Sequence, residues 1–311
     1  MTGAVGTQAA FGKDGIEIQK RTMEYLKIGA VDVSNQVIQR DRHAEFVMWM
    51  ANTVTTLDKI AVAFRSLQRS ELAEVEDFEE CVAAFVKNNG KGINITVPFK
   101  QQAWQLATQR SSRAERAGAV NTIIVKNDGS YFGDNTDGIG LARDLINNHQ
   151  IPLSGKNILI IGAGGAVRGV IEPIMENNPD VLVIANRTVA KALQLADDFS
   201  DLGNISGCGF DELDGNSFDI VINGTSASLH GELPPLPDKL FSDNACAYDM
   251  MYAAEPTIFM QWASQPRAEN VFDGLGRLVE KAAESFNMWR GVLQEAQPVI
   301  SDIEIDLKDT T

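Results

Sequence analysis

The segment from Asn157 to Thr188 constrains the fold more than any other part of the sequence. Residues 157–161 form a short, nearly unbroken apolar run, which is typical of a strand buried on both faces of a parallel sheet. A glycine-rich stretch follows at once, and apolar residues then recur with helical spacing from Val167 to Met175. A second apolar run, Val181 to Ala185, comes next. The pattern predicts a strand–turn–helix–strand unit, and therefore an α/β fold of the nucleotide-binding type.

The glycine-rich turn indicates how such a unit would bind its nucleotide. Glycines let the backbone approach a pyrophosphate, which would lie at the N-terminus of the next helix among free N–H groups. Val167 occupies the position of the third glycine in the G-x-G-x-x-G pattern, so an ordinary α/β domain with a tight glycine turn is the alternative. The cofactor contacts expected from the turn are those of Gly162, Ala163, Gly164, Gly165 and Ala166.

The residues after the second strand indicate which nucleotide is bound. NAD enzymes usually carry an Asp or Glu here, which holds the ribose 2′-hydroxyl. This chain has Asn186, Arg187 and Thr188 instead, with Lys191 one turn into the next helix. A guanidinium group suits a 2′-phosphate, so the sequence favours NADP. For Lys191 the alternative is a solvated cation on a helix surface.

Composition excludes several classes of partner. A length of 311 residues is enough for two domains, each with its own core. The formal net charge of −15 argues against nucleic acid or an anionic membrane, because binding either requires a basic surface. No segment has the apolar pattern of a signal peptide or a membrane span. We therefore expect a cytoplasmic enzyme with a small-molecule substrate, either a monomer or a homodimer.

The cysteines and histidines give no metal or disulfide signal. Three cysteines are an odd count without a C-x-x-C pair, and we expect buried thiols at Cys81, Cys208 and Cys246. The three histidines are scattered, so no metal site is expected. Acid–base chemistry should therefore fall to Lys, Asp or Tyr.

The chain divides into two α/β halves without a low-complexity linker. In the first half we expect strands at 60–64 and 92–97, helices at 72–86 and after Pro98, and a hairpin of 121–126 with 130–134. In the second half we expect helices at 138–149, 189–199 and 275–289, and strands at 218–223 and 246–250. The predicted domains are an N-terminal α/β substrate domain over 1–137, with 1–50 atypical, a Rossmann-like NADP-binding domain over 138–273, and C-terminal helices over 274–311 that pack back across both.

Seven short blocks together match one family, in the right order. The chain resembles shikimate dehydrogenase over about residues 58–300, and the blocks that carry the resemblance are Asn-Ile-Thr-Val-Pro-Phe-Lys at 94–100, Ala-Gly-Ala-Val-Asn-Thr at 117–122, Gly-Asp-Asn-Thr-Asp-Gly at 133–138, Gly-Ala-Gly-Gly-Ala at 162–166 with Arg168, Asn-Arg-Thr at 186–188, Tyr-Asp-Met-Met-Tyr at 248–252 and Asp-Gly-Leu-Gly at 273–276.

The resemblance implies reversible reduction of 3-dehydroshikimate to shikimate with NADPH, and it assigns Lys100 and Asp137 as the acid–base pair. The assignment is physically sensible, because an ionised Asp137 would keep Lys100 protonated and able to stabilise the developing alkoxide. Taken alone, Lys100 is a surface lysine after a Pro-Phe pair and Asp137 is a helix N-cap.

The resemblance also implies further binding residues. It assigns Asn94, Thr96, Asn121 and Tyr252 to the substrate, and it assigns Asn223, Thr225 and Gly274, together with Arg187, Thr188 and Lys191, to the cofactor. The alternatives are that Asn121 only begins a strand and that Tyr252 is a core aromatic.

The N-terminal region departs from the family. Members normally carry a Ser-x-Ser motif that binds the substrate carboxylate, and residues 1–52 contain none. Either the N-terminus has been altered, or the carboxylate meets a different set of groups, with Arg40, Arg42 and His43 as candidates.

Two cations are further departures. Lys281 stands where the family usually has a substrate-binding Gln, and Arg277 where an apolar residue is common. They form a like-charge i, i+4 pair, which is more easily explained if an anion lies between them. We therefore predict that Lys281 binds a substrate carboxylate; the alternative is that Glu280 and Glu284 neutralise a solvated face.

These departures leave two rival functions open. One is a dehydrogenase for another cyclic hydroxy acid such as quinate, and the other is an NADPH-binding homologue without catalytic activity.

Overall fold

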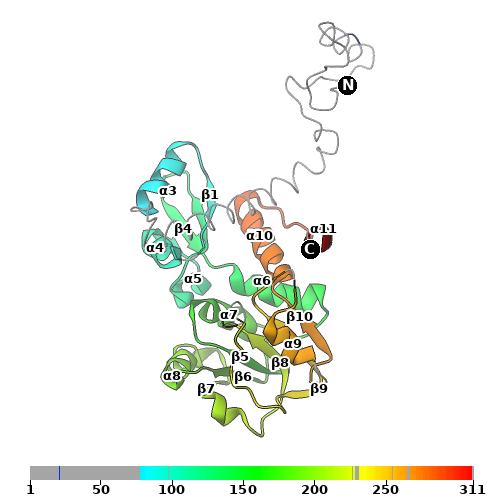
Figure 1. Ribbon diagram of the computed structural model, residues 1–311. Coiled ribbons are helices and arrows are strands. Elements are labelled where there is room, and N and C mark those ends of the chain that lie inside the picture. The colour runs from blue at the N-terminus through cyan, green and yellow to red at the C-terminus, as the bar shows by residue number, and fades with distance from the viewer. Residues whose placement is uncertain are drawn as a thin grey trace. The chain divides into compact units, whose positions relative to one another are not determined.

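The computed structural model describes Arg21 and residues 78–96, 98–225, 227, 231–253, 255–264 and 267–309 (Figure 1). The expected strand at 60–64, the start of the helix expected at 72–86, and the candidates Arg40, Arg42 and His43 lie outside the described residues.

A four-stranded sheet forms the first half of the described chain. Its order is β1 (Gly92–Asn94), β3 (Thr122–Val125), β4 (Tyr131–Asp134) and β2 (Gln109–Arg110). Strands β3 and β4 are antiparallel with Thr122 opposite Asp134, which confirms the expected hairpin. The helices of this half are α3 (Phe78–Lys87), α4 (Lys100–Leu106) and α5 (Ser112–Ala117). The strand expected at 92–97 is shorter, because its ladder with β3 ends at Asn94.

A six-stranded parallel sheet forms the second half. Its order is β10 (Asn270–Phe272), β9 (Phe241–Asp249), β8 (Phe218–Asn223), β5 (Asn157–Ile161), β6 (Val181–Ala185) and β7 (Ile205–Cys208). Every neighbouring pair of strands is parallel. The order reverses between β5 and β8, which is the switch point where such sheets bind ligands. The predicted Rossmann-like α/β fold is confirmed.

Strand β5 shows why its apolar run is unbroken. Ile158 and Ile160 belong to one apolar cluster, while Leu159 and Ile161 belong to a second cluster on the opposite face of the sheet. The first cluster is built with α7 (Gly165–Met175) and α8 (Val189–Asp198), and the second with α9 (Ile258–Ser264). In a strand covered on both faces, every side chain is buried, and a polar side chain without a hydrogen bond there would lower stability.

Some elements and burial states differ from expectation. Cys246 is buried, but Cys208 is half-buried and Cys81 is exposed beside the buried Val82 of α3, so the expectation of three buried thiols is wrong. Strand β9 begins at Phe241 rather than at 246, and the short β2, β7, β10 and α9 were not expected. These four segments are too short to show a clear period. The last helix α11 (Gln297–Asp309) lies within the C-terminal helices expected over 274–311.

Helix α6 (Asp137–Arg143) packs closely against two other helices and continues into a π-helical turn, η3 (Asp144–Asn148). A Cβ atom on Gly138 would lie 2.4 Å from the Gly169 carbonyl oxygen of α7. A Cβ atom on Gly140 would lie 2.7 Å from the carbonyl oxygen of Arg277 and 2.9 Å from the nitrogen of Lys281, both on α10 (Leu275–Arg290). Glycines therefore let the three backbones approach one another, and this fixes the first residue of α6.

Helix α10 contacts both halves. At its start, Gly274 donates a hydrogen bond to the Met251 carbonyl after β9, and near its end the Trp289 indole donates to the Ile123 carbonyl in β3. Figure 1 shows α10, in orange, beside α6. The expected packing across both halves is confirmed for α10, whereas the domain boundaries at 137/138 and 273/274 stay predictions. Within the described ranges, no helix is both long and apolar enough to span a membrane.

We predict that Gly140→Ala lowers the free energy of unfolding by about 1–3 kcal/mol, although alanine is the better helix former. The added methyl group would meet backbone atoms of Arg277 and Lys281, which cannot move aside as a side chain can. Chemical denaturation measures the change. Gln102→Ala on the exposed face of α4 is the control, and an equally small effect of both variants would contradict the packing argument.

Candidate functional site

Lys100 and Asp137 form an ion pair between the starts of two helices. The Lys100 Nζ atom lies 2.5 Å from the Asp137 Oδ2 atom, across 37 residues of sequence. The Asp137 side chain is only 4% exposed, and that of Lys100 is 22% exposed. Thr136 occupies the N-cap position of α6, so the alternative interpretation of Asp137 as an N-cap is wrong. A buried ion pair that joins two helix starts is a candidate functional site.

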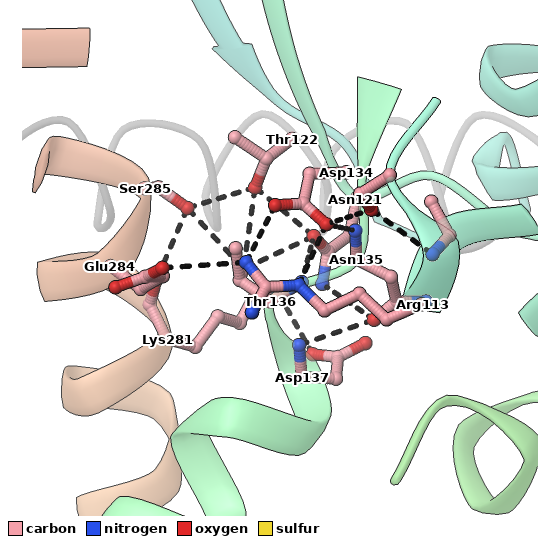
Figure 2. Close-up of polar contacts among 12 residues, drawn as sticks. Arg113, Asn121, Thr122, Asp134, Asn135, Thr136, Asp137, Lys281, Glu284 and Ser285 are labelled. Carbon is pink, nitrogen blue, oxygen red and sulfur yellow. Dashed lines mark hydrogen bonds and ion pairs between the residues drawn. The ribbon is translucent and has the colours of Figure 1, made fainter. Parts of the chain in front are cut away.

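A buried polar network fixes the turn that carries Asp137 (Figure 2). The Asn121 Oδ1 atom accepts hydrogen bonds from the Thr136 nitrogen at 2.9 Å and from the Thr136 hydroxyl at 3.1 Å. The Asn135 Oδ1 atom accepts from the Asp137 nitrogen at 3.2 Å. Because these bonds hold successive backbone groups, the position of the Asp137 side chain is defined before any ligand binds.

The same network ties the turn to α10. Arg113 donates to both carboxylate oxygens of Asp134, at 2.8 and 2.6 Å, and reaches Glu284 of α10 at 3.3 Å. The hydroxyls of Thr122 and Ser285 lie 2.8 Å apart, and Figure 2 shows both side chains between β3 and α10. Helix α10 is therefore held in register with β3 and β4.

Two further cations from α10 reach the Asp137 carboxylate. The Arg277 Nη1 atom and the Lys281 Nζ atom each lie 3.4 Å from the Asp137 Oδ1 atom. Their side chains are 13% and 14% exposed. Arg277 also donates from Nη2 to the Met250 carbonyl at 3.0 Å. Asp137 is thus surrounded by three cations from two other helices.

These charges set the ionisation of the site. Burial by itself would raise the pKa of Asp137, but the charges of Lys100, Lys281 and Arg277 outweigh burial and hold this pKa well below its usual value. Burial lowers the pKa of Lys281 to about 8; Asp137 opposes this shift, and the cations Lys100 and Arg277 add to it. Asp137 is therefore ionised at neutral pH, and Lys281 changes charge just above neutral pH.

The space between Arg277 and Lys281 holds an internal carboxylate. An anion does relieve their like-charge repulsion, as expected, but it is Asp137. Glu280 and Glu284 do not neutralise the pair: Glu280 accepts from Asn148 at 3.2 Å, and Glu284 pairs with Arg113 and Arg143. The assignment of Lys281 to a substrate carboxylate stays a prediction, and it competes with an ion pair that already exists.

The other residues assigned to the substrate lie at different depths. Asn121 is fully buried, and its oxygen is engaged by Thr136 and Thr122. Asn121 therefore supports the turn before α6, and it does more than begin a strand. Asn94 is half-buried and accepts from the Thr122 hydroxyl at 3.1 Å. Thr96 is half-buried. Tyr252 is half-buried against an apolar cluster of α10 and α11.

The glycine-rich turn has the geometry needed to hold a pyrophosphate. Gly162 has φ +110°, a left-handed conformation that favours glycine. Nothing lies within 4 Å of a Cβ atom built on Gly164 or Gly165, so the space beside the turn is open. The first bond within α7 is donated by the Arg168 nitrogen to the Gly164 carbonyl, so the preceding N–H groups have no partner in the helix. The residues present fit an anionic group at this helix start.

The residues after β6 include two exposed cations. The Asn186 side chain donates to the Thr188 carbonyl at 3.0 Å and so shapes the turn. Arg187, Thr188 and Lys191 are exposed. Among the described residues no carboxylate pairs with Arg187 or Lys191, which leaves both cations available to a ligand.

The remaining residues assigned to the cofactor have structural partners. Asn223 is fully buried, donates to Asp249 at 3.1 Å and accepts from the Thr225 hydroxyl at 2.8 Å. A Cβ atom on Gly274 would lie 2.3 Å from the Met250 carbonyl oxygen, so glycine is required there by packing. Their assignment to the cofactor stays a prediction.

Sequence reasoning missed the network of Arg113, Asp134, Glu284 and Ser285. A signal was present in α10, where Arg277, Lys281, Glu284 and Ser285 recur at i, i+4, i+7 and i+8 and so share one polar face. The partners of that face lie about 150 residues earlier, as in the separation of 163 between Thr122 and Ser285. Within the described ranges no group of three His, Cys, Asp or Glu side chains could hold a metal ion.

We predict that Lys281→Gln raises the free energy of unfolding at neutral pH by on the order of 1–3 kcal/mol. The folded-state pKa of Lys281, about 8, lies below its value of 10.5 in water, so the charged form is disfavoured by folding. The penalty is full below pH 8 and disappears as the pH rises to 10.5, so the gain should shrink over that interval. Denaturation at several pH values measures it, and a destabilised variant would contradict the argument.

Comparison with known proteins identifies the family. A family model described as the shikimate dehydrogenase substrate binding domain matches residues 50–123, and one described as shikimate / quinate 5-dehydrogenase matches residues 142–230. The shikimate dehydrogenase (NADP(+)) of Cellvibrio japonicus is 54% identical over 239 residues, which cover 77% of this chain and 86% of that protein.

Solved structures agree with the sequence comparison. An Ael1 enzyme from Pseudomonas putida is 43% identical, with a TM-score of 0.71 over 76% of this chain and 86% of the other. The shikimate 5-dehydrogenase of Thermus thermophilus in complex with NADP(H) and shikimate is 26% identical, with a TM-score of 0.64 over 83% of this chain and 94% of the other. The chain therefore belongs to the shikimate dehydrogenase family of NADP-dependent enzymes, as its seven sequence blocks predicted.

Proposed function

We propose that this chain reduces 3-dehydroshikimate to shikimate with NADPH, reversibly, and that Lys100 and Asp137 transfer the proton. The buried ion pair of 2.5 Å between these two residues is the observation that supports the proposal most strongly. The pair lies at the carboxyl edge of the parallel sheet, because Arg277 joins Asp137 to the Met250 carbonyl directly after β9. Open α/β sheets bind their ligands at this edge.

The reaction needs one hydride and one proton. Bound NADPH supplies the hydride to the ketone carbon. The Lys100 ammonium donates a proton to the ketone oxygen as negative charge develops there, and in the reverse direction the neutral amine accepts the proton from the hydroxyl. Asp137 stays ionised throughout, because its pKa is well below the usual value, and it orients the ammonium through Oδ2. Together, the ketone, NADPH and one proton give the alcohol and NADP⁺.

The substrate's polar groups would be held around this pair. We assign Asn94, Thr96, Asn121 and Tyr252 to the hydroxyl and carboxylate groups of the substrate. The Asn121 oxygen is occupied by Thr136, which leaves its amide nitrogen as the group that could face a ligand. Among the described residues that nitrogen has one long hydrogen bond, of 3.5 Å to Asn135, which a substrate oxygen could replace.

The cofactor would lie along the edge formed by the β5 and β6 turns. The N–H groups at the start of α7 would hold the pyrophosphate, and Arg187 and Lys191 would hold the 2′-phosphate. We propose a soluble cytoplasmic enzyme, monomeric or homodimeric, whose partners are small molecules rather than nucleic acid. Sedimentation of the purified chain tests the oligomeric state.

We predict that Lys100→Ala lowers kcat for 3-dehydroshikimate by about 10²–10⁴, because it removes a positioned acid–base group. Asp137→Asn should act in the same direction. Binding of NADPH, followed by fluorescence titration, should stay nearly unchanged in both. Arg290→Ala, at the exposed end of α10, is the control. Wild-type turnover by Lys100→Ala would refute the catalytic assignment.

We predict that Arg187→Ala weakens NADPH binding by about ten- to a hundredfold, since a charge-assisted contact to phosphate contributes on the order of 1.5–3 kcal/mol. NADH lacks the 2′-phosphate, so its affinity should change little. Titration of both cofactors measures the difference. Equal losses for NADPH and NADH would mean that Arg187 does not contact the phosphate.

Turnover of a small panel of hydroxy acids separates the rival functions. Shikimate as the best substrate supports the proposal, and quinate as the best substrate supports a related dehydrogenase. Tight NADPH binding without turnover of any member of the panel would support a non-catalytic homologue.

A further inference from the structure

Asp137 has more cationic partners than a two-residue acid–base pair requires. Lys100 engages the Oδ2 atom, while Arg277 and Lys281 both lie 3.4 Å from the Oδ1 atom. Arg277 is also held through its Nη2 atom, which donates a hydrogen bond to the Met250 carbonyl. Both oxygens of the carboxylate are therefore engaged, Oδ2 by the cation of α4 and Oδ1 by the two cations of α10.

We propose that Arg277 and Lys281 are positioning residues that act on proton transfer through Asp137. They hold the Oδ1 atom in place and share the charge of the carboxylate, which then attracts the Lys100 ammonium less strongly than a carboxylate with one partner would. The proton on Lys100 is released more readily to a ketone oxygen as a result. This inference rests on the proposed role of Lys100 and Asp137.

The packing of α6 on α10 makes this arrangement rigid. A Cβ atom on Gly140 would lie 2.9 Å from the Lys281 nitrogen and 3.1 Å from its Cβ atom, so α6 directly covers the segment of α10 that carries Lys281. The Ser285 hydroxyl donates to the Lys281 carbonyl at 3.1 Å, one turn further along α10. The backbone of Lys281 is therefore held in place beside the start of α6, which carries Asp137.

The charge of Lys281 changes within an accessible pH range. Its pKa is lowered to about 8, first by burial and then by the nearby cations, against the effect of Asp137. The charged groups on the elements around it are Asp137 of α6, Lys100 of α4 and, on α10 itself, Arg277, Glu280 and Glu284. When Lys281 loses its proton, Asp137 loses one partner and holds the Lys100 ammonium more firmly. The rate of reduction should therefore fall through this ionisation.

A double-mutant cycle tests the inference by kinetics. We compare the parent, Lys281→Gln, Asp137→Asn and the double variant, with Arg290→Gln on the exposed end of α10 as control. The measurements are kcat and KM for 3-dehydroshikimate at saturating NADPH, across neutral and alkaline pH. In the parent, Lys281→Gln should remove the ionisation near pH 8 from the kcat profile and lower kcat below pH 8 by about two- to a hundredfold, with a smaller change in KM.

The Asp137→Asn background decides whether Lys281 acts through Asp137. If it does, Lys281→Gln should have no further effect there, because residues in one ion-pair network are not additive. Equal effects in both backgrounds would overturn the inference. A rise in KM alone, in both backgrounds, would also overturn it and would mean that Lys281 binds the substrate carboxylate directly.

A titration without substrate keeps the two proposals distinguishable. Nitrogen NMR of the Lys281 side chain should show that Asp137→Asn lowers its pKa further below 8, and that Arg277→Met raises it. Unchanged titration in the Arg277→Met variant would overturn the inference even if Asp137→Asn fails to fold. Loss of turnover in Lys100→Ala with no coupling at Lys281 would refute the inference alone. If the Lys281 pKa shifts in these variants as expected but the parent does not reduce 3-dehydroshikimate, the proposed function is refuted, and with it this role.

Discussion

One buried carboxylate determines how the site is assembled. Three cations from α4 and α10 meet at Asp137, and without its charge only like charges would meet there. Two unit charges of like sign about 4 Å apart repel by about 4 kcal/mol at an effective dielectric constant of about 20. With the carboxylate in place, each cation has a partner within ion-pair distance. The convergence of these helix segments on one point therefore depends on a single negative charge.

The balance of charge at this point is incomplete, and the two pKa shifts show it together. The pKa of Asp137 lies well below its usual value, because three cations outweigh the effect of its burial, and the pKa of Lys281 is lowered to about 8, first by burial and further by the other two cations, against the effect of the single carboxylate. Selection for stability alone would not favour burying an excess of positive charge. The fold carries it because α6 and α10 are locked together by the contact at Gly140 and by the polar network around Thr122 and Ser285.

The sequence predicts the nucleotide-binding half well because its local signals agree. The apolar run of β5, the glycine turn and the helical stripe of α7 each indicate the same unit, and the structure has all three at the expected residues. The hairpin of β3 and β4 and the long helix α10 follow for the same reason. Short strands such as β10 carry no period, and their existence depends on a neighbouring strand that no local pattern shows.

The site was predictable only in part, for a physical reason. The i, i+4 relation of Arg277 and Lys281 shows that they are neighbours on a helix and that an anion should lie between them, but it does not say which element packs over that face. The answer comes from Asp137, 140 residues earlier than Arg277, and only the close approach at Gly140 makes it possible. Because Asp137 already lies within 3.4 Å of both cations, a substrate carboxylate at this point would compete with an internal ion pair. This competition is the physical reason for inferring that the two cations of α10 act through Asp137 on the proposed proton donor Lys100.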